Sequence, residues 1–339
     1  MIEKITLKNF RLFDNVTFDT SNSLIIFSGK NRTGKTTALE SIYLCSTAKS
    51  HRDNDLENII KKNKEFASVE LFSQKKLKVV ITNKEKSFFC NNKEINASNF
   101  IGNIKTVMIS PADLSIIDGK NQARRHFLDL NISLVNKKYL TALKAYKKLL
   151  KERNELLKEE NIDLKLLDVL TDELIEYLKQ IYNIRFDLIN KINNYLNEIS
   201  KNMNIETIKL EYLKSYDEDV KKSFNDKRKY DLLTKTTNIG IHRDTFNIFI
   251  DDMLADSFAS EGQRKTIVFA IKVAIMKYIK EMTGEDPIVL LDDIFAAMDN
   301  IRIEKITNYI KNFKQTFIST TSIIDIPDEL LKKSLVIRL

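Results

Sequence analysis

Residues 29–36 read Gly29-Lys30-Asn31-Arg32-Thr33-Gly34-Lys35-Thr36, directly after the apolar run Leu24-Ile25-Ile26-Phe27. This is the pattern G-x-x-x-x-G-K-[ST] between a predicted strand and a predicted helix, which is the setting of a phosphate-binding P-loop. Its glycines let the backbone bend so that N–H groups converge on anionic oxygens. Lys35 can reach the β- and γ-phosphates of a nucleoside triphosphate, and the Thr36 hydroxyl can coordinate Mg²⁺.

The composition limits the class of protein. A chain of 339 residues with 43% hydrophobic and 30% charged residues can bury the core of one large or two ordinary domains. No apolar run is long enough to span a bilayer, no signal-peptide pattern opens the chain, and Cys45 and Cys90 lack metal-ligand spacing. We therefore expect a cytoplasmic protein with reduced thiols and no membrane partner. The net charge of +8 fits a polyanionic partner, although a lysine-rich composition bias gives the same charge.

The ends and the middle of the chain differ in pattern. No glycine or proline lies between Gly119 and Gly240, and apolar residues there recur at helical spacing. The charged stretch 217–229 within it reads as a loop. Short apolar runs typical of strands lie on either side, at residues 5–8, 24–27, 69–72, 77–81, 88–90, 107–109, 288–291 and 316–319. The pattern predicts an α/β P-loop head formed by residues 1–120 and 238–339, with a helical arm of residues 121–237 inserted.

A second motif follows the apolar run Ile288-Val289-Leu290-Leu291, which ends in Asp292-Asp293. A buried strand that delivers a carboxylate to the carboxyl edge of the sheet, beside a P-loop, is a Walker B pattern. Asp292 would hold Mg²⁺ together with Thr36, and Asp293 would orient or deprotonate the attacking water. Alone, the two aspartates would read as a turn at the end of a strand.

A third motif precedes a predicted amphipathic helix. In Ala259-Ser260-Glu261-Gly262-Gln263, Ser260 is a natural N-cap, and the helix amino terminus that follows attracts phosphate. An ordinary capped helix would carry the same residues.

Taken together, the three motifs resemble those of ATP-binding-cassette ATPases, whose signature is Leu-Ser-x-Gly-Gln. In that superfamily the signature of one subunit covers the γ-phosphate held by the P-loop of the other. The resemblance implies an ATP-bridged homodimer in which Ser260, Glu261, Gly262 and Gln263 act in trans. It also places Asp299 at the D-loop, just after Walker B.

Further blocks narrow the resemblance to the heads of SMC- and Rad50-like ATPases, and within these to the RecF family. They are Ile5-Thr6-Leu7-Lys8-Asn9-Phe10-Arg11, Ser50-His51-Arg52, Ile109-Ser110-Pro111-Ala112-Asp113-Leu114, Arg124-Arg125-His126-Phe127-Leu128-Asp129 and Gly240-Ile241-His242-Arg243-Asp244. Within this family the position of Arg32 is usually Gly or a small residue.

The resemblance implies a set of site residues. Lys35, Asp292 and Asp293 would serve catalysis, and Thr36 and Asp292 would bind Mg²⁺. The residues expected to contact ATP are Gly29, Lys30, Asn31, Arg32, Thr33, Gly34, Lys35, Thr36, Thr37 and Arg11.

The resemblance also implies a role in recombinational repair. An ATP-driven dimer would bind single-strand gaps or junctions of single- and double-stranded DNA and, with the RecO and RecR proteins, promote loading of the RecA recombinase. A weak, DNA-dependent ATPase would act as a conformational switch, and slow hydrolysis would reset the dimer. No residue is assigned to DNA at this point.

Two alternatives stay open on the sequence. One is an SMC- or Rad50-like ATPase head of another DNA-processing or defence system, and the other is the nucleotide-binding subunit of a transporter.

Overall fold

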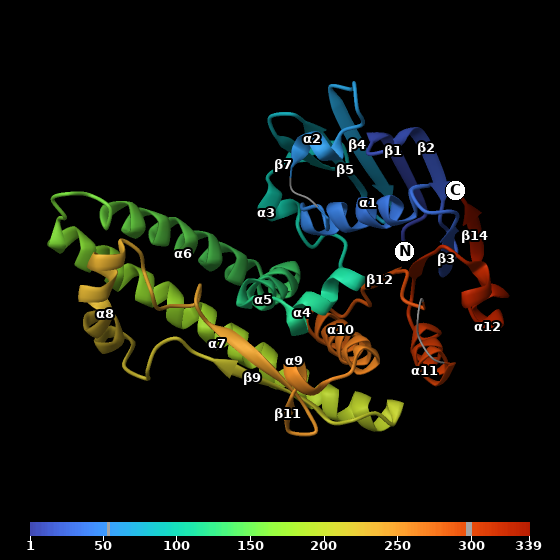
Figure 1. The fold of residues 1–339 in the computed structure, drawn as a ribbon. Coiled ribbons are helices and arrows are strands. Elements are labelled where there is room, and N and C mark those ends of the chain that lie inside the picture. Colours follow the sequence, from blue (N-terminus) through green and yellow to red (C-terminus); the bar gives the residue numbers. More distant parts are fainter. Residues whose placement is uncertain (53–54, 296–299) are drawn as a thin grey trace. The chain divides into compact units, whose positions relative to one another are not determined.

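The computed structural model describes residues 1–52, 55–295 and 300–339, and these form two compact units (Figure 1). The first unit, here the head unit, comprises Met1–Leu114 and Lys265–Leu339, and the second, the arm unit, comprises Ser115–Arg264. The predicted arm ended at residue 237, whereas residues 238–264 group with the arm. The reason is local: β10 (Thr245–Ile250) pairs along its whole length with β9 (Ile208–Leu213), which belongs to the arm.

A five-stranded parallel sheet forms the centre of the head unit, in the order β14-β3-β13-β12-β8. Its strands are β3 (Leu24–Ser28), β8 (Thr106–Ile109), β12 (Ile288–Asp292), β13 (Thr316–Thr320) and β14 (Leu335–Arg338). The strands β3, β8, β12 and β13 are buried almost throughout, which explains their continuous apolar sequences. The P-loop strand β3 lies between β13 and β14.

The second sheet of the head unit is antiparallel, in the order β2-β1-β4-β5-β6-β7. Its strands are β1 (Lys4–Phe10), β2 (Phe13–Asp19), β4 (Phe66–Phe72), β5 (Lys76–Thr82), β6 (Lys86–Cys90) and β7 (Lys93–Ile95). In β1 and β5, buried and accessible side chains alternate, so one face is core and the other faces solvent. The turn at Asn91-Asn92 between β6 and β7 has φ angles of 50° and 65°, as a two-residue hairpin turn requires.

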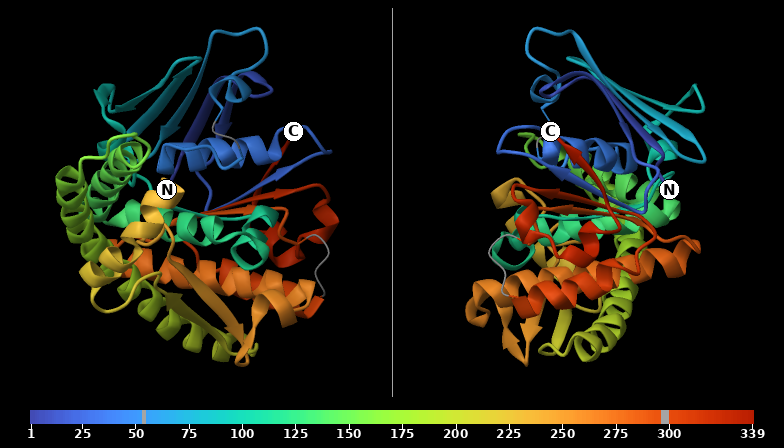
Figure 2. Two further views of the ribbon diagram at one scale, coloured as in Figure 1. Left: turned by 60° about the vertical axis from the view of Figure 1, so that its left-hand side comes forward. Right: turned by 90° about the vertical axis from the view of Figure 1, so that its right-hand side faces the viewer.

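Helix α1 (Lys35–Thr47) lies between the two sheets (Figures 1 and 2). It contacts β4 and β5 on one side and β3, β8, β12 and β13 on the other. Every residue of α1 except Thr36 is buried, which explains why its sequence has no polar face. The helix that follows the P-loop is therefore fixed on all sides.

The remaining helices of the head unit are short, apart from α10 and α11. They are α2 (Leu56–Ile59), α3 (Ala97–Phe100), the 3₁₀ turns η1 (Pro111–Leu114) and η2 (Ile323–Asp325), α11 (Asn300–Ile310) and α12 (Asp328–Leu331). Helix α10 (Glu261–Thr283) has its first turn in the arm unit and the rest in the head unit.

The arm unit is built on the 40-residue helix α7 (Leu164–Met203), against which α6 (Lys137–Leu156) and β9 pack (Figure 1). Its other helices are α4 (Ser115–Asp118), α5 (Asn121–Val135), α8 (Val220–Thr234) and α9 (Ala255–Phe258). The prediction of a helical arm was incomplete, because β9, which lies within residues 121–237, forms a three-stranded antiparallel sheet with β10 and β11 (Met253–Leu254). The predicted loop at 217–229 was also wrong: α8 begins there, capped by the Asp219 side chain, which accepts from Lys222 N.

The block Gly240–Asp244 lies at the centre of the arm unit and carries a buried polar network. The Asp244 carboxylate accepts from the Tyr212 hydroxyl at 2.9 Å and from both N and Oγ of Ser215 at 2.9 Å. His242 bridges the Tyr146 hydroxyl at 2.8 Å and the carbonyl oxygen of Thr237 at 3.0 Å. Burial lowers the pKa of His242 to about 4, so the imidazole is neutral and acts as a packing group.

Candidate nucleotide site

The P-loop connects β3 to α1, and two of its residues have left-handed backbone conformations. Gly34 has φ 113°, and a Cβ atom there would lie 2.5 Å from Cζ of Phe13, so only glycine fits. Arg32 has φ 70°, which explains why a glycine also suits this position. The Arg32 side chain is exposed to solvent, so the loop accommodates it without a steric conflict.

Lys35 is held by the loop that precedes it. Its Nζ donates to the carbonyl oxygens of Gly29 at 2.8 Å and Lys30 at 2.7 Å, and the residue is 8% exposed. These bonds aim a single buried ammonium group at the interior of the loop. An anionic phosphate placed there would gain a charge-assisted hydrogen bond in a region shielded from water.

The two motifs meet at Thr36 and Asp292. The Thr36 hydroxyl donates to Oδ1 of Asp292 at 2.8 Å, and the Ser319 hydroxyl donates to the same oxygen at 2.5 Å. Asp292 ends β12 and Ser319 lies opposite it on the parallel neighbour β13. The carboxyl ends of neighbouring parallel strands thus deliver oxygen groups to the amino terminus of α1.

Thr36 and Asp292 suit a magnesium ion. Mg²⁺ is usually bound by one or two protein oxygens, with phosphate oxygens and water completing its octahedron. In the described part of the chain no cluster of three or more His, Cys, Asp or Glu side chains could hold a metal by itself. The pair therefore fits an ion whose other ligands come from a bound nucleotide and from water.

Asp293 follows in a left-handed conformation, with φ 52°. Its N–H donates to Ser319 at both the carbonyl oxygen, 3.1 Å away, and Oγ, 3.3 Å away. Burial and the neighbouring Asp292 charge raise the pKa of the Asp293 carboxyl, while Lys35 opposes the shift. A carboxylate with an increased proton affinity at the mouth of the loop suits a base that accepts a proton from water.

A cavity of about 250 Å³ lies at this edge of the sheet. Its wall includes many of the predicted site residues: Asn31, Arg32, Gly34, Lys35, Thr36, Thr37, Asp292 and Asp293. Five further residues complete the wall: Leu12, Arg52, Pro111, Ser319 and Thr321. Gly29 and Lys30 contribute through the carbonyl groups that hold Lys35, and the Thr33 hydroxyl bonds within the loop to the Lys30 carbonyl at 3.0 Å.

Three of the added residues are polar and were missed as site residues. Ser319 ends the predicted strand 316–319 and Thr321 follows it closely, so the rule that parallel strands present their carboxyl ends together could have found them. Arg52 belongs to the block Ser50-His51-Arg52 of the family resemblance, but no site role was predicted for it. It lies in the cavity wall, and its backbone N–H donates to Ser50 Oγ at 3.1 Å.

Arg11 has a different environment from the one expected. Its guanidinium forms a two-pronged pair with the fully buried Glu40 of α1, with Nη2 at 2.6 Å and Nε at 3.0 Å from the carboxylate oxygens. Nη1 donates to the Asn58 carbonyl at 2.8 Å, and Arg11 is not part of the cavity wall. An ATP contact by Arg11 stays a prediction; the observed pairing ties β1 to α1.

The predicted signature residues belong to the arm unit, at the start of α10. Ser260 and Gln263 form a capping box: Gln263 N donates to Ser260 Oγ at 3.3 Å, and Ser260 N donates to Gln263 Oε1 at 2.8 Å. Gln263 also donates to Glu206 at 2.8 Å. Ser260 and Glu261 are exposed, and Gly262 and Gln263 are partly buried, so this helix end is accessible on its own unit. The predicted D-loop residue Asp299 lies outside the described residues.

Across the described ranges, none of the helices is both long and apolar enough to cross a membrane.

Comparison with known proteins identifies the family of the chain. The family model described as RecF/RecN/SMC N terminal domain matches residues 1–327. The DNA replication and repair protein RecF of Oenococcus oeni is 34% identical over 356 residues, covering 98% of this chain and 95% of that protein. The RecF protein of Acholeplasma laidlawii is 36% identical over 325 residues, covering 94% of this chain and 93% of that protein.

A solved structure described as the recombination mediator protein RecF-ATPrS in the RecFOR pathway matches with a TM-score of 0.91 and 27% identity, over 100% of this chain and 96% of that one. The near full-length matches favour the RecF resemblance over both alternatives that the sequence left open. The fold is that of an SMC-type P-loop ATPase head with an inserted arm, and the chain belongs to the RecF family of DNA replication and repair proteins.

Proposed function

We propose that this chain is an ATP-dependent DNA-binding protein of recombinational repair. The observation that carries the proposal is the convergence of Lys35, Thr36 and Asp292 at one cavity. The fold relative in complex with the nucleotide designated ATPrS supports it, as do the repair names of the sequence relatives.

The P-loop backbone from Gly29 to Thr37 would surround the phosphates, with Lys35 as its one buried cation. Thr36 and Asp292 would hold Mg²⁺, which supplies charge neutralisation to the bound triphosphate. Asp293 would take the proton of the attacking water, and its increased proton affinity suits that task.

The signature would act between two copies of the chain. Helix α10 has 23 residues, so its amino terminus carries a substantial partial positive charge, and the capping box of Ser260 and Gln263 fixes the geometry of that end. An ATP held by the P-loop of one copy and covered by Ser260, Glu261, Gly262 and Gln263 of the other would bridge a homodimer. Asp299 would line the same junction. Hydrolysis would remove the bridge and release the two copies.

The function that follows is a switch on DNA. ATP-driven dimers would bind gapped DNA, where single- and double-stranded segments meet, and with RecR and RecO proteins would promote RecA loading. Affinity for DNA and affinity for ATP would then be linked, each raising the other. Slow hydrolysis, dependent on DNA, would reset the cycle.

The proposal is tested by analytical ultracentrifugation of the full chain with and without ATP, Mg²⁺ and a labelled gapped duplex. We expect a monomer without nucleotide, and with ATP a dimer that sediments together with the DNA. A monomer under every condition, or DNA binding that ignores ATP, would overturn the proposal.

A further inference from the structure

The outer face of the antiparallel sheet in the head unit carries alternating aromatic and cationic side chains. The opposite, inner face is core: Ile5, Leu7, Val69, Leu71 and Val79 are fully buried. Because side chains alternate along a strand, the residues between them all point outward. The outward set on the three central strands comprises Lys4, Thr6, Lys8, Phe66, Ser68, Glu70, Phe72, Lys76, Lys78, Val80 and Thr82.

The strand register places these side chains in cross-strand rows. Lys4 lies opposite Phe72, and Phe72 lies opposite Lys76. The ammonium groups of Lys4 and Lys76 lie 5.6 Å and 5.2 Å from the centroid of the Phe72 ring. One aromatic ring on this face is therefore flanked by two cations from neighbouring strands.

The pairing of ring and cation recurs along the sheet. Lys8 Nζ lies 5.3 Å from the centroid of Phe66, a side chain that is 36% exposed. Lys78 lies opposite Phe89 of β6, which is half-buried on the same face. Three rings, two on β4 and one on β6, thus each have at least one lysine beside them.

The charge of the face is positive at its centre. On the outer face of β1, β4 and β5 one carboxylate, Glu70, stands against four lysines: Lys4, Lys8, Lys76 and Lys78. Glu70 forms ion pairs with Lys78 at 2.8 Å and with Lys76 at 3.3 Å. The other carboxylates of these rows, Asp19 and Glu94, lie on the outer strands β2 and β7.

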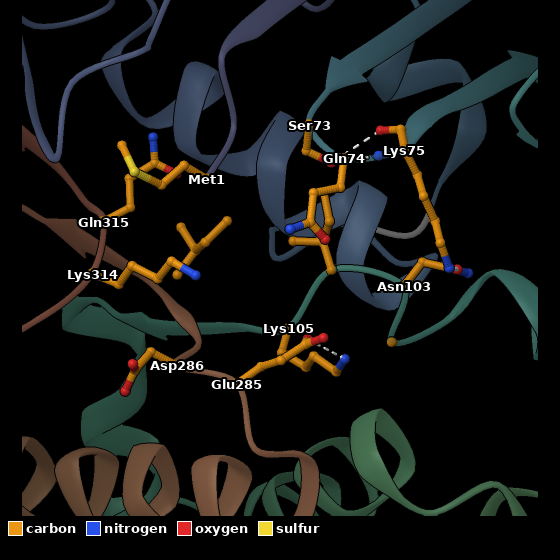
Figure 3. A pocket seen from close by; sticks show the side chains of 13 residues that line it. Met1, Ser73, Gln74, Lys75, Asn103, Lys105, Glu285, Asp286, Lys314 and Gln315 are labelled. Atoms are coloured by element: carbon orange, nitrogen blue, oxygen red, sulfur yellow. Dashed lines mark hydrogen bonds and ion pairs between the residues drawn. The ribbon is translucent and has the colours of Figure 1, made fainter.

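More cations gather at a cavity beside the turn that follows Phe72. The cavity has a volume of about 240 Å³, and its wall includes Lys75 of that turn together with Lys105 and Lys314 (Figure 3). The pKa of Glu285 there is held down first by its hydrogen bond from Lys105, and also by the charges of Lys314 and Lys75. This cavity lies at the amino-terminal ends of β8, β12 and β13, the opposite edge of the parallel sheet from the nucleotide cavity.

We propose that this outer sheet face is a binding surface for single-stranded nucleic acid, with Phe66, Phe72 and Phe89 stacking on unpaired bases and Lys4, Lys8, Lys76 and Lys78 contacting the phosphates. The inference rests on the proposed DNA-binding function and specifies the surface for the unpaired strand. A flat ring offers a stacking surface to any base, and a sheet face that alternates rings and cations matches the alternation of bases and phosphates along a strand. An acidic protein segment would satisfy the lysines but leave the three rings without a flat partner.

The test uses the absence of tryptophan from the chain. In F72W the indole keeps a flat stacking surface and is the single tryptophan of the chain, so the fluorescence reports on this position alone. If a base stacks on the indole, the fluorescence should be quenched when the full chain binds an oligothymidine in the presence of ATP. F186W, at an exposed phenylalanine of the arm unit, is the matched control and should keep its fluorescence. Unchanged F72W fluorescence at saturating oligothymidine would overturn the inference.

The affinity measurement separates stacking from charge. F72L keeps an apolar side chain but loses the flat ring, and it should weaken oligothymidine binding roughly 5- to 100-fold while changing blunt-duplex binding less than about twofold. The double variant K4A/K76A should weaken binding to the oligothymidine and to the blunt duplex, and it should reduce the salt dependence of both affinities. Equal oligothymidine binding by F72L and wild type would refute the stacking role.

These outcomes are distinguishable from failure of the proposed function. If wild type binds gapped DNA with ATP and F72L does so equally well, only this surface is wrong. If wild type binds no DNA with ATP, the proposed function fails first. A lysine effect without a phenylalanine effect would identify the face as a general polyanion surface and would also overturn the inference.

Discussion

The Thr36 hydroxyl donates a hydrogen bond of 2.8 Å to Oδ1 of Asp292, across 256 positions of sequence. The hydroxyl belongs to the helix that follows the P-loop, and the carboxylate ends a strand of the last third of the chain. The site is therefore assembled only when both ends of the chain have folded into one sheet.

Lys35→Ala should weaken ATP binding roughly 10- to 150-fold, because it removes the buried cation of the loop and a charge-assisted hydrogen bond to phosphate. Isothermal titration with ATP and Mg²⁺ measures the effect. Lys30→Ala is the control, since that side chain is exposed and its residue acts through the backbone carbonyl. Unchanged affinity in Lys35→Ala would refute the assigned site.

Asp293→Asn should slow ATP turnover about 100-fold and leave ATP-driven association intact, because a neutral amide cannot accept the proton of the attacking water. Phosphate release and sedimentation with ATP measure the two properties. Asp286→Asn, at an exposed carboxylate on the opposite edge of the sheet, should behave as wild type. A variant that hydrolyses ATP at the normal rate would contradict the role of Asp293.

Ser260→Arg should leave ATP binding by the monomer intact and block association of two copies. The substitution replaces the N-cap that fixes the amino terminus of α10 with a long cationic side chain, and this helix end is the one proposed to cover the ATP of the other copy. Sedimentation with ATP distinguishes the two effects. Asn190→Arg, on an exposed position of α7, provides the same substitution away from that helix end. If Ser260→Arg forms dimers as stable as those of the wild type, the proposal that the signature residues of one copy cover the ATP of the other is contradicted.

Gly34→Ala should lower the urea midpoint of unfolding more than Gly284→Ala does. Both residues have positive φ, 113° and 70°, but a Cβ at Gly34 meets the Phe13 ring at 2.5 Å whereas a Cβ at Gly284 meets nothing within 4 Å. The second variant should cost about 1 kcal/mol from backbone strain alone, and the first should cost more because the Phe13 ring must also move. Equal midpoints would show that the loop is less tightly packed than described.

The stability gained by Asp293→Asn should depend on pH. Burial and the Asp292 charge raise the pKa of Asp293 in the folded state above its pKa in the unfolded state. Folding therefore favours the protonated carboxyl, and the free energy of unfolding of the wild type falls as the pH rises through the unfolded-state and then the folded-state pKa. The variant, which cannot ionise, should therefore gain more stability over wild type at pH 7 than near pH 4. Asparagine also suits φ 52°, but that gain is independent of pH. Urea unfolding at the two pH values measures the difference, and a constant difference would contradict the shift.

The sequence was most informative where a residue's role depends on its neighbours in the chain. The strands β3, β8, β12 and β13 were predicted because a strand buried on both faces has a continuous apolar sequence. The bend of the loop at Gly34, where φ is 113°, was predicted because a P-loop needs glycines that let its backbone curve around phosphate.

Roles that depend on tertiary contacts were not predicted. The arm sheet was missed because β9 and β10 pair across 32 to 42 residues of sequence that read as helix and loop. Arg52 lies in the wall of the nucleotide cavity, and the Ser50 hydroxyl that accepts from its backbone N–H itself donates to Glu40 of α1 at 2.5 Å. Arg11, for which an ATP contact stays a prediction, pairs with Glu40, a carboxylate whose burial within α1 no local pattern revealed.

The position of β3 between β13 and β14 has a consequence for how the protein is made. While the ribosome is still translating, the apolar strand that precedes the P-loop has neither of its hydrogen-bonding neighbours, since both are encoded after codon 315. In the nascent chain this strand must not aggregate with other chains while the arm is being synthesised. A message cut short before codon 316 would thus yield a product in which this apolar strand has neither neighbour and which is prone to aggregate.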